Sequence, residues 1–463
     1  MKALIFALSL IMPTSLFAQT PALDDYQVKN LDKAQIRQSD ILPYLEQVKQ
    51  DPLFSTTEIG RSYENRPVYR IQVGQGPLKV MMWSQMHGDE STATPALFDL
   101  IERIRRDEDW RESWQDEISL ILIPMLNPDG AELAQRHNAQ GIDINRDAKD
   151  LQTPEGRILM AQAKEIQPDI GFNLHDQSRF YSAGNTDKTA TISLLAPAFD
   201  EAKSISDQRK RAMQLIGILK QVGDEMIPGH LGRYDDTYAE RAFGDTLAGM
   251  GISTILIESG AYPGDINRQV ARKVNLAMLG RAIDSLVTKS YQKLDLAPYQ
   301  SIPMNERNAF RDVVISDLRV VDKEHRYLVD LALDLDLPEA QQVQIDEIGD
   351  LSPFPAFFRF DAGQWQFQPA KGMKLEGPLP LTRDKYLELL GKGVGYFEGD
   401  ETLLELKTDL PVAVNPGKLP TLRPLRNQQA VFFLKHEDGR RIAVIQGILV
   451  DLTSGKRLNQ YST

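Results

Sequence analysis

The stretch that decides the fold is residues 78–90, LKVMMWSQMHGDE. Its first eight residues form a short, mostly apolar run, which is typical of a strand buried on both faces of a sheet. His87 and Glu90 follow at once, before a helical pattern over residues 93–106. The segment therefore predicts a buried strand, a turn that carries polar side chains, and then a helix.

Further short apolar runs follow along the chain, and helical patterns lie between most of them. The runs are residues 119–126, 169–174, 189–195 and 251–257. The later helical patterns are residues 154–166, 207–227 and 267–286. Such alternation favours an α/β layer fold, in which helices cover a largely parallel or mixed sheet. We predict that residues 24–290 form this domain.

The character of the sequence changes beyond residue 290. Residues 295–305 contain two prolines and predict an irregular linker. Residues 325–336 alternate apolar and acidic side chains, which is typical of a half-buried strand. The Asp-Gly pair at 438–439 lies between two apolar runs and predicts a hairpin. We therefore expect a β-rich accessory domain, or two small ones, over residues 303–463.

Length and charge narrow the class of protein. The chain has 463 residues, which is too long for one ordinary core and favours two or three domains. The net charge of −12 argues against a nucleic-acid partner or an anionic membrane surface. The chain has no cysteine, which excludes disulfides, thiolate metal ligands and cysteine nucleophiles.

The first 18 residues have the pattern of a secretory signal peptide. Lys2 precedes an apolar run over residues 3–12, and Ala18 ends a small-residue cleavage site. The apolar run is shorter than the roughly 20 residues that a membrane span needs. We therefore expect cleavage after Ala18, no integral membrane span in the mature chain, and a periplasmic or secreted location.

Two histidines and two glutamates directly follow predicted strands. They are His87, Glu90, His175 and Glu258. Ligands of open α/β sheets gather at the carboxyl ends of strands, so we expect these side chains to meet. Two imidazoles and one carboxylate suit a catalytic zinc ion with an open position for water, whose pKa falls to roughly 7. The set predicts a zinc site with a second carboxylate beside it that can take a proton.

Residues 127–147 add charged side chains after another predicted strand. Arg136 and Arg146, with Asn145 beside the latter, are suited to binding a carboxylate or a developing oxyanion. Asp143 could accept the second ring proton of a metal-bound histidine, as metal sites usually require. The segment therefore predicts the substrate side of the same site.

In their order along residues 24–290, these motifs resemble the zinc carboxypeptidase family, which includes the pancreatic and regulatory carboxypeptidases. With the predicted signal peptide, the resemblance is to a bacterial secreted branch. The matching segments are residues 58–67 (EIGRSYENRP), 87–90 (HGDE), 127–130 (NPDG) and 136–146 (RHNAQGIDINR), with His175 and Glu258. The resemblance implies a carboxypeptidase-like mixed sheet covered by helices, followed here by the β-rich C-terminal domain.

The resemblance implies a role for each matched metal-site residue. His87, Glu90 and His175 would bind zinc, one ion per chain. Glu258 would act as the general base on the attacking water and then as proton donor to the leaving amine.

The same resemblance implies roles on the substrate side. Arg136 would polarise the scissile carbonyl and hold the oxyanion. Asn145 and Arg146 would bind the terminal carboxylate of the substrate. Asp143 would orient His87.

Together these roles imply a zinc metallocarboxypeptidase, a peptide hydrolase whose substrate is a peptide with a free carboxylate. Three alternatives stay open from the sequence. One is a zinc amidase or peptidase acting on cell-wall (murein) peptides. Another is a zinc hydrolase that removes acyl groups from amino acids. The third is a non-catalytic peptide-binding homologue, although all three ligands, the base and the arginine are present together.

Three positions are open within the resemblance. Asp147 stands where the family often has asparagine, and it would add negative charge beside the expected carboxylate site. The tyrosine that covers the substrate is expected to be Tyr238, with Tyr234 as its rival. Asp245 could attract a basic side chain of the substrate, or it could form a structural salt bridge or helix cap.

Overall fold

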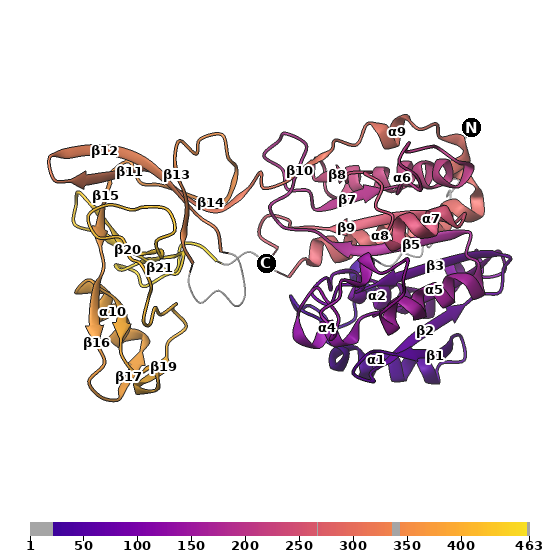
Figure 1. Cartoon of the computed structure of the whole chain (residues 1–463), viewed down its shortest axis with the longest axis horizontal. Coiled ribbons are helices and arrows are strands. Elements are labelled where there is room, and N and C mark those ends of the chain that lie inside the picture. Colours follow the sequence, from indigo (N-terminus) through magenta and orange to yellow (C-terminus); the bar gives the residue numbers. More distant parts are fainter. Residues whose placement is uncertain (1–21, 266, 336–342, 461–463) are drawn as a thin grey trace, which may run out of the picture.

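The structure is a computed structural model that describes residues 22–265, 267–335 and 343–460. The chain forms two bodies joined near residue 310 (Figure 1). The predicted signal peptide lies outside the described residues. Within the described ranges, no helix is long and apolar enough to cross a membrane.

The first body is built on an eight-stranded mixed sheet with the strand order β1-β2-β4-β3-β5-β9-β7-β8. The central strands β4, β3, β5 and β9 are mutually parallel, and β1 and β2 pair antiparallel with their neighbours. Strand β7 is antiparallel to β9 and parallel to β8. The strands are β1 (Ser55–Arg61), β2 (Pro67–Val73), β3 (Leu78–Ser84), β4 (Ile118–Ile123), β5 (Ile170–Asp176), β7 (Ile192–Leu195), β8 (Leu231–Arg233) and β9 (Ser253–Ser259).

Helices cover both faces of this sheet. In β3, Met82 packs into a core with helices α2, α6 and α8, whereas Met81 faces a second core with α5 and α7. This alternation follows from the two-residue period of a strand. The helices are η1 (Leu23–Tyr26), α1 (Gln38–Gln50), α2 (Ala93–Arg106), α3 (Glu108–Glu112), α4 (Pro128–Leu133), η2 (Ile144–Arg146), α5 (Pro154–Ile166), α6 (Asp207–Met226), α7 (Phe243–Gly249) and α8 (Gln269–Thr288). The predicted mixed α/β class is confirmed.

The second body is rich in β-structure, as predicted. Its main sheet has the order β13-β12-β11-β15-β20-β21-β22, with β14 paired to β11, and two small sheets pair β16 with β18 and β17 with β19. The elements are β11 (Arg311–Asp322), β12 (His325–Leu333), β13 (Ile345–Gly349), β14 (Ala356–Asp361), β15 (Trp365–Pro369), β16 (Lys371–Lys374), β17 (Leu379–Thr382), α10 (Arg383–Gly391), β18 (Val394–Glu398), η4 (Glu401–Leu403), β19 (Leu404–Lys407), β20 (Val431–His436), β21 (Arg441–Ile445) and β22 (Ile448–Asp451).

Two strand predictions in this body have different outcomes. The hairpin at 438–439 is confirmed, because β20 and β21 flank it as antiparallel partners. The half-buried pattern expected for residues 325–336 is wrong, because residues 325–328 of β12 are all exposed. Strand β12 pairs with β13 only from Asp330 onward. Residues 325–328 of β12 therefore have β11 as a neighbour on one side and no paired strand among the described residues on the other.

The junction between the bodies is more ordered than the linker predicted for residues 295–305. It contains η3 (Ser290–Lys293), α9 (Ala297–Gln300) and β10 (Asn305–Glu306), and β10 pairs with β6 (Ser182–Ala183). Tyr299 and Ile302 are buried in the core of the first body. Apolar burial therefore continues past residue 290, while the division into residues 24–290 and 303–463 stays a prediction.

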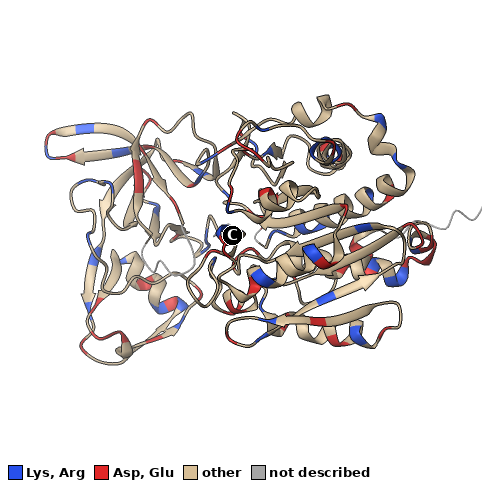
Figure 2. Ribbon diagram, turned by 45° about the vertical axis from the view of Figure 1, so that its right-hand side comes forward, with Lys and Arg blue, Asp and Glu red and all other residues tan. Residues whose placement is uncertain are grey.

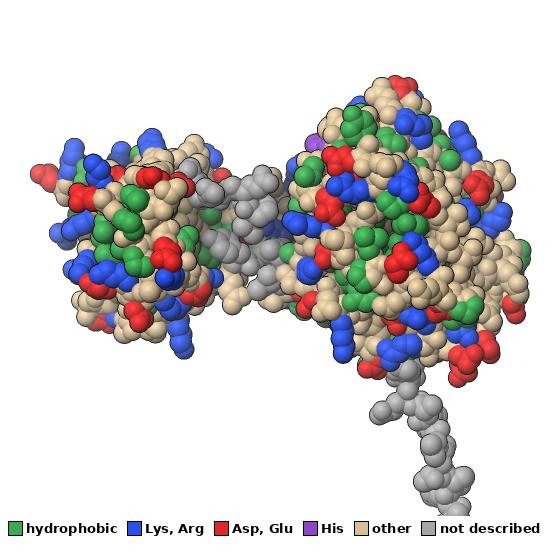
Figure 3. Space-filling model, turned by 90° about the horizontal axis from the view of Figure 1, so that it is seen from below, with side chains coloured by type: hydrophobic (Ala, Val, Ile, Leu, Met, Phe, Trp, Pro, Cys, Tyr) green, Lys and Arg blue, Asp and Glu red, His purple; other side chains and the backbone are tan. Residues whose placement is uncertain are grey.

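Both bodies carry charges of both signs. Figure 2 shows lysine and arginine interspersed with aspartate and glutamate along the ribbons, and Figure 3 shows the same mixture on the face seen from below.

Candidate metal and substrate site

The strand order brings the predicted ligands to one edge of the sheet. His87 and Glu90 lie in the turn between β3 and α2, while His175 is in β5 and Glu258 in β9. Strand β5 lies between β3 and β9 and is parallel to both, and in the β5–β9 pair His175 is the register partner of Glu258. Three adjacent carboxyl ends therefore carry the four side chains.

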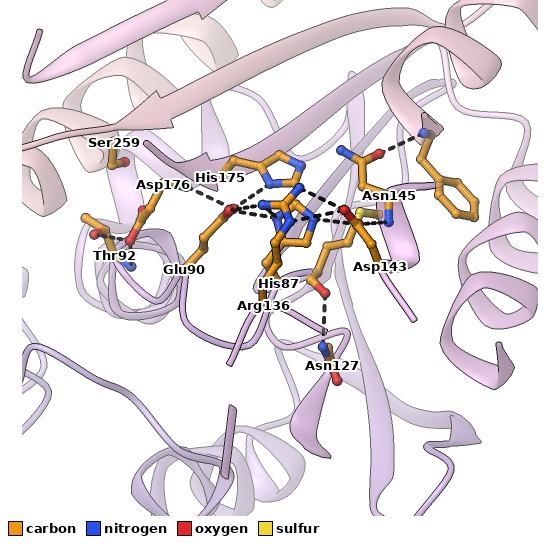
Figure 4. Close-up of polar contacts among 12 residues, drawn as sticks. His87, Glu90, Thr92, Asn127, Arg136, Asp143, Asn145, His175, Asp176 and Ser259 are labelled. Atoms are coloured by element: carbon orange, nitrogen blue, oxygen red, sulfur yellow. Dashed lines mark hydrogen bonds and ion pairs between the residues drawn. The ribbon is translucent and has the colours of Figure 1, made fainter. Parts of the chain in front are cut away.

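His87, Glu90 and His175 form a compact donor set, with their ligand atoms within 4.8 Å of one another. One carboxylate oxygen of Glu90 lies 2.7 Å from Nδ1 of His87, and the other lies 2.6 Å from Nδ1 of His175 (Figure 4). Both imidazoles are 2% exposed. Two imidazole nitrogens and a carboxylate are the donors that zinc prefers, so the residues fit this metal.

The charges in this set favour a cation. Burial opposes ionisation of Glu90, but the two histidines hold the pKa of its carboxyl well below the usual range. Burial also lowers the pKa of His175. For His87 burial acts in the same direction, but the Glu90 charge and the hydrogen bond with Asp143 raise the pKa to about 9. The carboxylate thus stabilises positive charge between the rings, which a bound divalent ion would also supply.

Asp143 and Arg136 enclose the donor set on one side (Figure 4). Asp143 Oδ1 lies 3.1 Å from Nε2 of His87. Asp143 Oδ2 accepts a hydrogen bond of 3.1 Å from Nε of Arg136 and forms an ion pair with the same guanidinium at 3.0 Å. The Arg136 guanidinium is also 3.1 Å from Glu90 Oε1. Burial opposes ionisation of Asp143, but His87 and Arg136 hold the pKa of its carboxyl well below the usual range. Arg136 is therefore fixed beside the donor set, where it can meet developing negative charge.

Asn145 and Arg146 reach the same pocket from η2. The Asn145 side-chain oxygen accepts a hydrogen bond of 2.9 Å from the Phe243 backbone N–H, which leaves the amide nitrogen for other partners. The Arg146 guanidinium lines the pocket and donates to the Asn145 backbone carbonyl at 2.7 Å. Asp143 caps this short helix through the Asn145 N–H. The pair can present an amide and a guanidinium to a substrate carboxylate.

Asp147 does not act as the sequence suggested. Its side chain is buried and accepts hydrogen bonds from the backbone N–H of Gln152 and from both the N–H and the hydroxyl of Thr153. The carboxylate therefore closes the loop that leads into α5. The expected added negative charge at the carboxylate site is not found, because these donors satisfy the group away from the pocket.

Glu258 is buried beside the donor set. Its burial, and then the charges of Glu90 and Asp176, raise the pKa of its carboxyl well above the usual range. Tyr234 lies close enough for the Glu258 charge to act on it, and burial raises the pKa of its hydroxyl. Tyr234 lines the pocket, whereas Tyr238 does not. The loop between β8 and α7 therefore places Tyr234, the rival to Tyr238, in the pocket lining, and which of the two covers a substrate stays a prediction.

The pocket has a volume of about 570 Å³. Asp245 lines it and also accepts a hydrogen bond of 2.9 Å from the Ala239 backbone N–H, so this carboxylate supports the loop before α7. Sequence reasoning missed several lining residues: Asp176, Gln177, Ser178, Tyr181, Arg268, Arg307 and Asn308. The first three follow His175 directly and Tyr181 lies six residues after it, so these four could have been found from that position. No pattern in the sequence identifies Arg307 and Asn308, because tertiary packing brings them to the rim.

Two histidines and one glutamate are a ligand set that catalytic zinc sites use, with an open position for water. Residues 41–167 match the family model described as "Zinc carboxypeptidase". Over these residues, which include His87 and Glu90, the chain is similar to that family.

Individual relatives are distant and cover only part of the chain. The probable carboxypeptidase 2 of Trichophyton verrucosum is 23% identical over 159 residues, which cover 34% of this chain and 28% of the relative. The catalytic chain of human carboxypeptidase N is 31% identical over 120 residues, covering 20% of this chain and 26% of that protein. The chain thus matches less than a third of the length of these relatives.

The solved structures to which the chain is similar are also distant in sequence and cover only part of this chain. A metallo-carboxypeptidase from Burkholderia cenocepacia is 18% identical, with a TM-score of 0.46 over 56% of this chain and 71% of that one. A putative carboxypeptidase from Burkholderia mallei is 19% identical, with a TM-score of 0.47 over 56% and 70%.

Proposed function

We propose that this protein is a zinc-dependent metallocarboxypeptidase that removes C-terminal residues from peptides with a free terminal carboxylate. The observation that carries the proposal is the register of β5 and β9, which sets Glu258 beside His175 at the end of the sheet. A buried carboxylate next to a zinc-type donor set, in a chain similar to the zinc carboxypeptidase family, supports hydrolysis of an amide bond.

His87, Glu90 and His175 would hold the metal. When bound, zinc would act as a Lewis acid and lower the pKa of water. Glu258 would accept a proton from the attacking water and return it to the leaving amine. Burial of Glu258 raises the pKa of its carboxyl, which favours uptake of a proton from water.

The remaining polar residues would handle the substrate. Arg136, held by Asp143, would stabilise negative charge as it develops on the carbonyl oxygen. Asn145 and Arg146 would bind the terminal carboxylate, and Tyr234 would cover the bound residue. We further propose that residues 1–18 direct the protein out of the cytoplasm, so that it acts on peptides in the periplasm or outside the cell.

The test is a mass-spectrometric screen of the zinc-loaded protein against free peptides and cell-wall muropeptides. We expect products that lack one residue at the carboxyl end, about one zinc per chain, and loss of both activity and metal on chelation. His175→Ala should lose the metal, while His325→Ala, which changes an exposed histidine of the second body, should keep it. Internal cleavage, cleavage of muropeptides alone, or full metal content in His175→Ala would overturn the proposal.

A further inference from the structure

Two arginines besides Arg136 and Arg146 line the pocket. Arg268 lies just before α8, and Arg307 follows β10 at the junction of the two bodies. The Arg268 guanidinium donates to the Ser259 carbonyl at 2.8 Å and lies 3.5 Å from Asp176. Figure 4 shows Asp176 and Ser259 on one side of the histidines, and Asn145 on the other. The donor set therefore lies between two cationic ends.

The segment that carries Arg307 is linked to Ser259 through a chain of contacts. The Asn305 side chain donates to Gln177 Oε1 at 3.1 Å, and the Gln177 N–H donates to the Ser259 carbonyl at 2.8 Å. Ser259 is also the residue that holds Arg268. The segment that carries Arg307 is therefore joined to the segment that holds Arg268.

The backbone on both sides of Arg307 is anchored to the loop that follows His175. Before it, Asn305 and Glu306 pair with β6. After it, the Ala309 N–H donates to the Phe180 carbonyl at 3.0 Å. Asn308 adopts a positive φ of 55°, which turns the chain between the two anchors. Arg307 is therefore presented at the pocket rim by a fixed backbone.

Arg268 and Arg307 differ in their ion-pair partners. Arg268 shares its charge with Asp176, whereas Arg307 is exposed and forms no ion pair with any residue that the structure describes. A guanidinium without a carboxylate partner can bind one with two parallel hydrogen bonds. The terminal carboxylate of the substrate is already assigned to Arg146, so the group that Arg307 would bind belongs to another part of the substrate.

We propose that Arg307, assisted by Arg268, forms a subsite for an acidic side chain on the amino-terminal side of the scissile bond. The inference rests on the proposed carboxypeptidase function, because that function places the terminal carboxylate at Arg146. The subsite makes the enzyme selective for acidic peptides. It also gives the segment that enters the β-rich body a direct part in substrate recognition.

The test uses N-acetylated tetrapeptides in pairs, with glutamate or glutamine at each of the three positions before the terminal residue. At one position, the wild type should show a kcat/KM roughly fivefold higher for glutamate, the size expected for a partly exposed ion pair. The preference should shrink at high salt, because exposed charges are screened. Arg307→Gln should abolish it and Arg307→Lys should keep part of it. Arg281→Gln, which alters an exposed arginine on α8 outside the pocket, should leave it unchanged.

Calorimetric binding of the same pairs to zinc-loaded Glu258→Gln protein separates this proposal from the proposed activity. If no peptide is cleaved but the glutamate form binds more tightly, and Arg307→Gln removes the difference, the activity is wrong and the subsite stands. Equal binding and equal turnover of glutamate and glutamine forms at all three positions would overturn the subsite. So would a glutamate preference that survives Arg307→Gln.

Discussion

The carboxylate of Asp143 lies 3.1 Å from the Nε2 atom of His87. The other ring nitrogen, Nδ1, faces Glu90 at 2.7 Å. The Asp143 contact therefore selects the orientation in which Nδ1 is the nitrogen offered to a metal. A carboxylate in this position also makes the imidazole a better ligand.

Removing this carboxylate should weaken the metal site without removing a ligand. We expect Asp143→Ala to lower zinc affinity by about 10- to 100-fold, the usual effect of losing a group that orients a metal-bound histidine. A competition titration with a zinc chelator measures this change. Asp150→Ala, which removes an exposed carboxylate seven residues away, is the control. Unchanged zinc affinity in Asp143→Ala would show that His87 is held by other contacts.

Replacing the Glu258 carboxylate by an amide should separate metal binding from turnover. We expect Glu258→Gln to keep its zinc and to lose about a hundred- to ten-thousandfold in kcat, because general-base catalysis is typically worth this much. Metal analysis and steady-state kinetics on one preparation measure both. Glu201→Gln, at an exposed position, should behave as the wild type. Near-normal turnover in Glu258→Gln would assign the base to a different carboxylate.

Asp245 should make stability depend on pH in a defined direction. Burial raises the pKa of Asp245 to about 6, whereas an aspartate in an unfolded chain has a pKa of about 3.9. Between these values the folded state binds the proton and the unfolded state does not, so stability falls as pH rises through this window. Asp245→Asn keeps the acceptor for the Ala239 N–H and removes this loss.

The measurement for Asp245 is the melting temperature of the variant minus that of the wild type, at pH 4 and at pH 7. We expect this difference to be more positive at pH 7. A difference that is constant with pH, or larger at pH 4, would contradict the buried-carboxyl explanation.

The buried ion pair between Arg179 and Asp312 joins the two bodies. Two hydrogen bonds of 2.9 and 2.6 Å connect the side chains, and Arg179 also donates to the Leu335 carbonyl. We expect Arg179→Met alone to cost about 3–5 kcal/mol, because a buried carboxylate loses its guanidinium. The double variant Arg179→Met, Asp312→Leu should cost less than that single change. Denaturation of the single and double variants measures the coupling, and additive losses would exclude it.

Much of the site could be predicted because its residues occupy the ends of strongly patterned strands. The apolar run before His87 and the helix after Glu90 form as expected, and the pairing of β3, β5 and β9 brings the donors together. The local sequence pattern determines these strands and helices, and the parallel pairing of the strands places their carboxyl ends at one edge of the sheet.

The features that could not be predicted depend on loops and on contacts distant in sequence. An irregular loop determines whether Tyr234 or Tyr238 lines the pocket, and such a loop has no repeating sequence pattern from which its shape could be predicted. Asp147 is satisfied by a turn whose shape the sequence does not determine. Arg307 reaches the pocket only because β10 pairs with β6, more than a hundred residues away. Neither the spacing of residues nor the composition of these segments predicts the pairing of β10 with β6.

The most direct test of the account compares each good peptide substrate with its C-terminally amidated form. The wild type should cleave the free form much faster, because Arg146 and Asn145 have a carboxylate to bind. Arg146→Ala should cleave both forms slowly and at similar rates, and Arg157→Ala, an exposed arginine outside the pocket, should keep the wild-type difference. Equal cleavage of free and amidated peptides by the wild type would contradict the carboxypeptidase assignment.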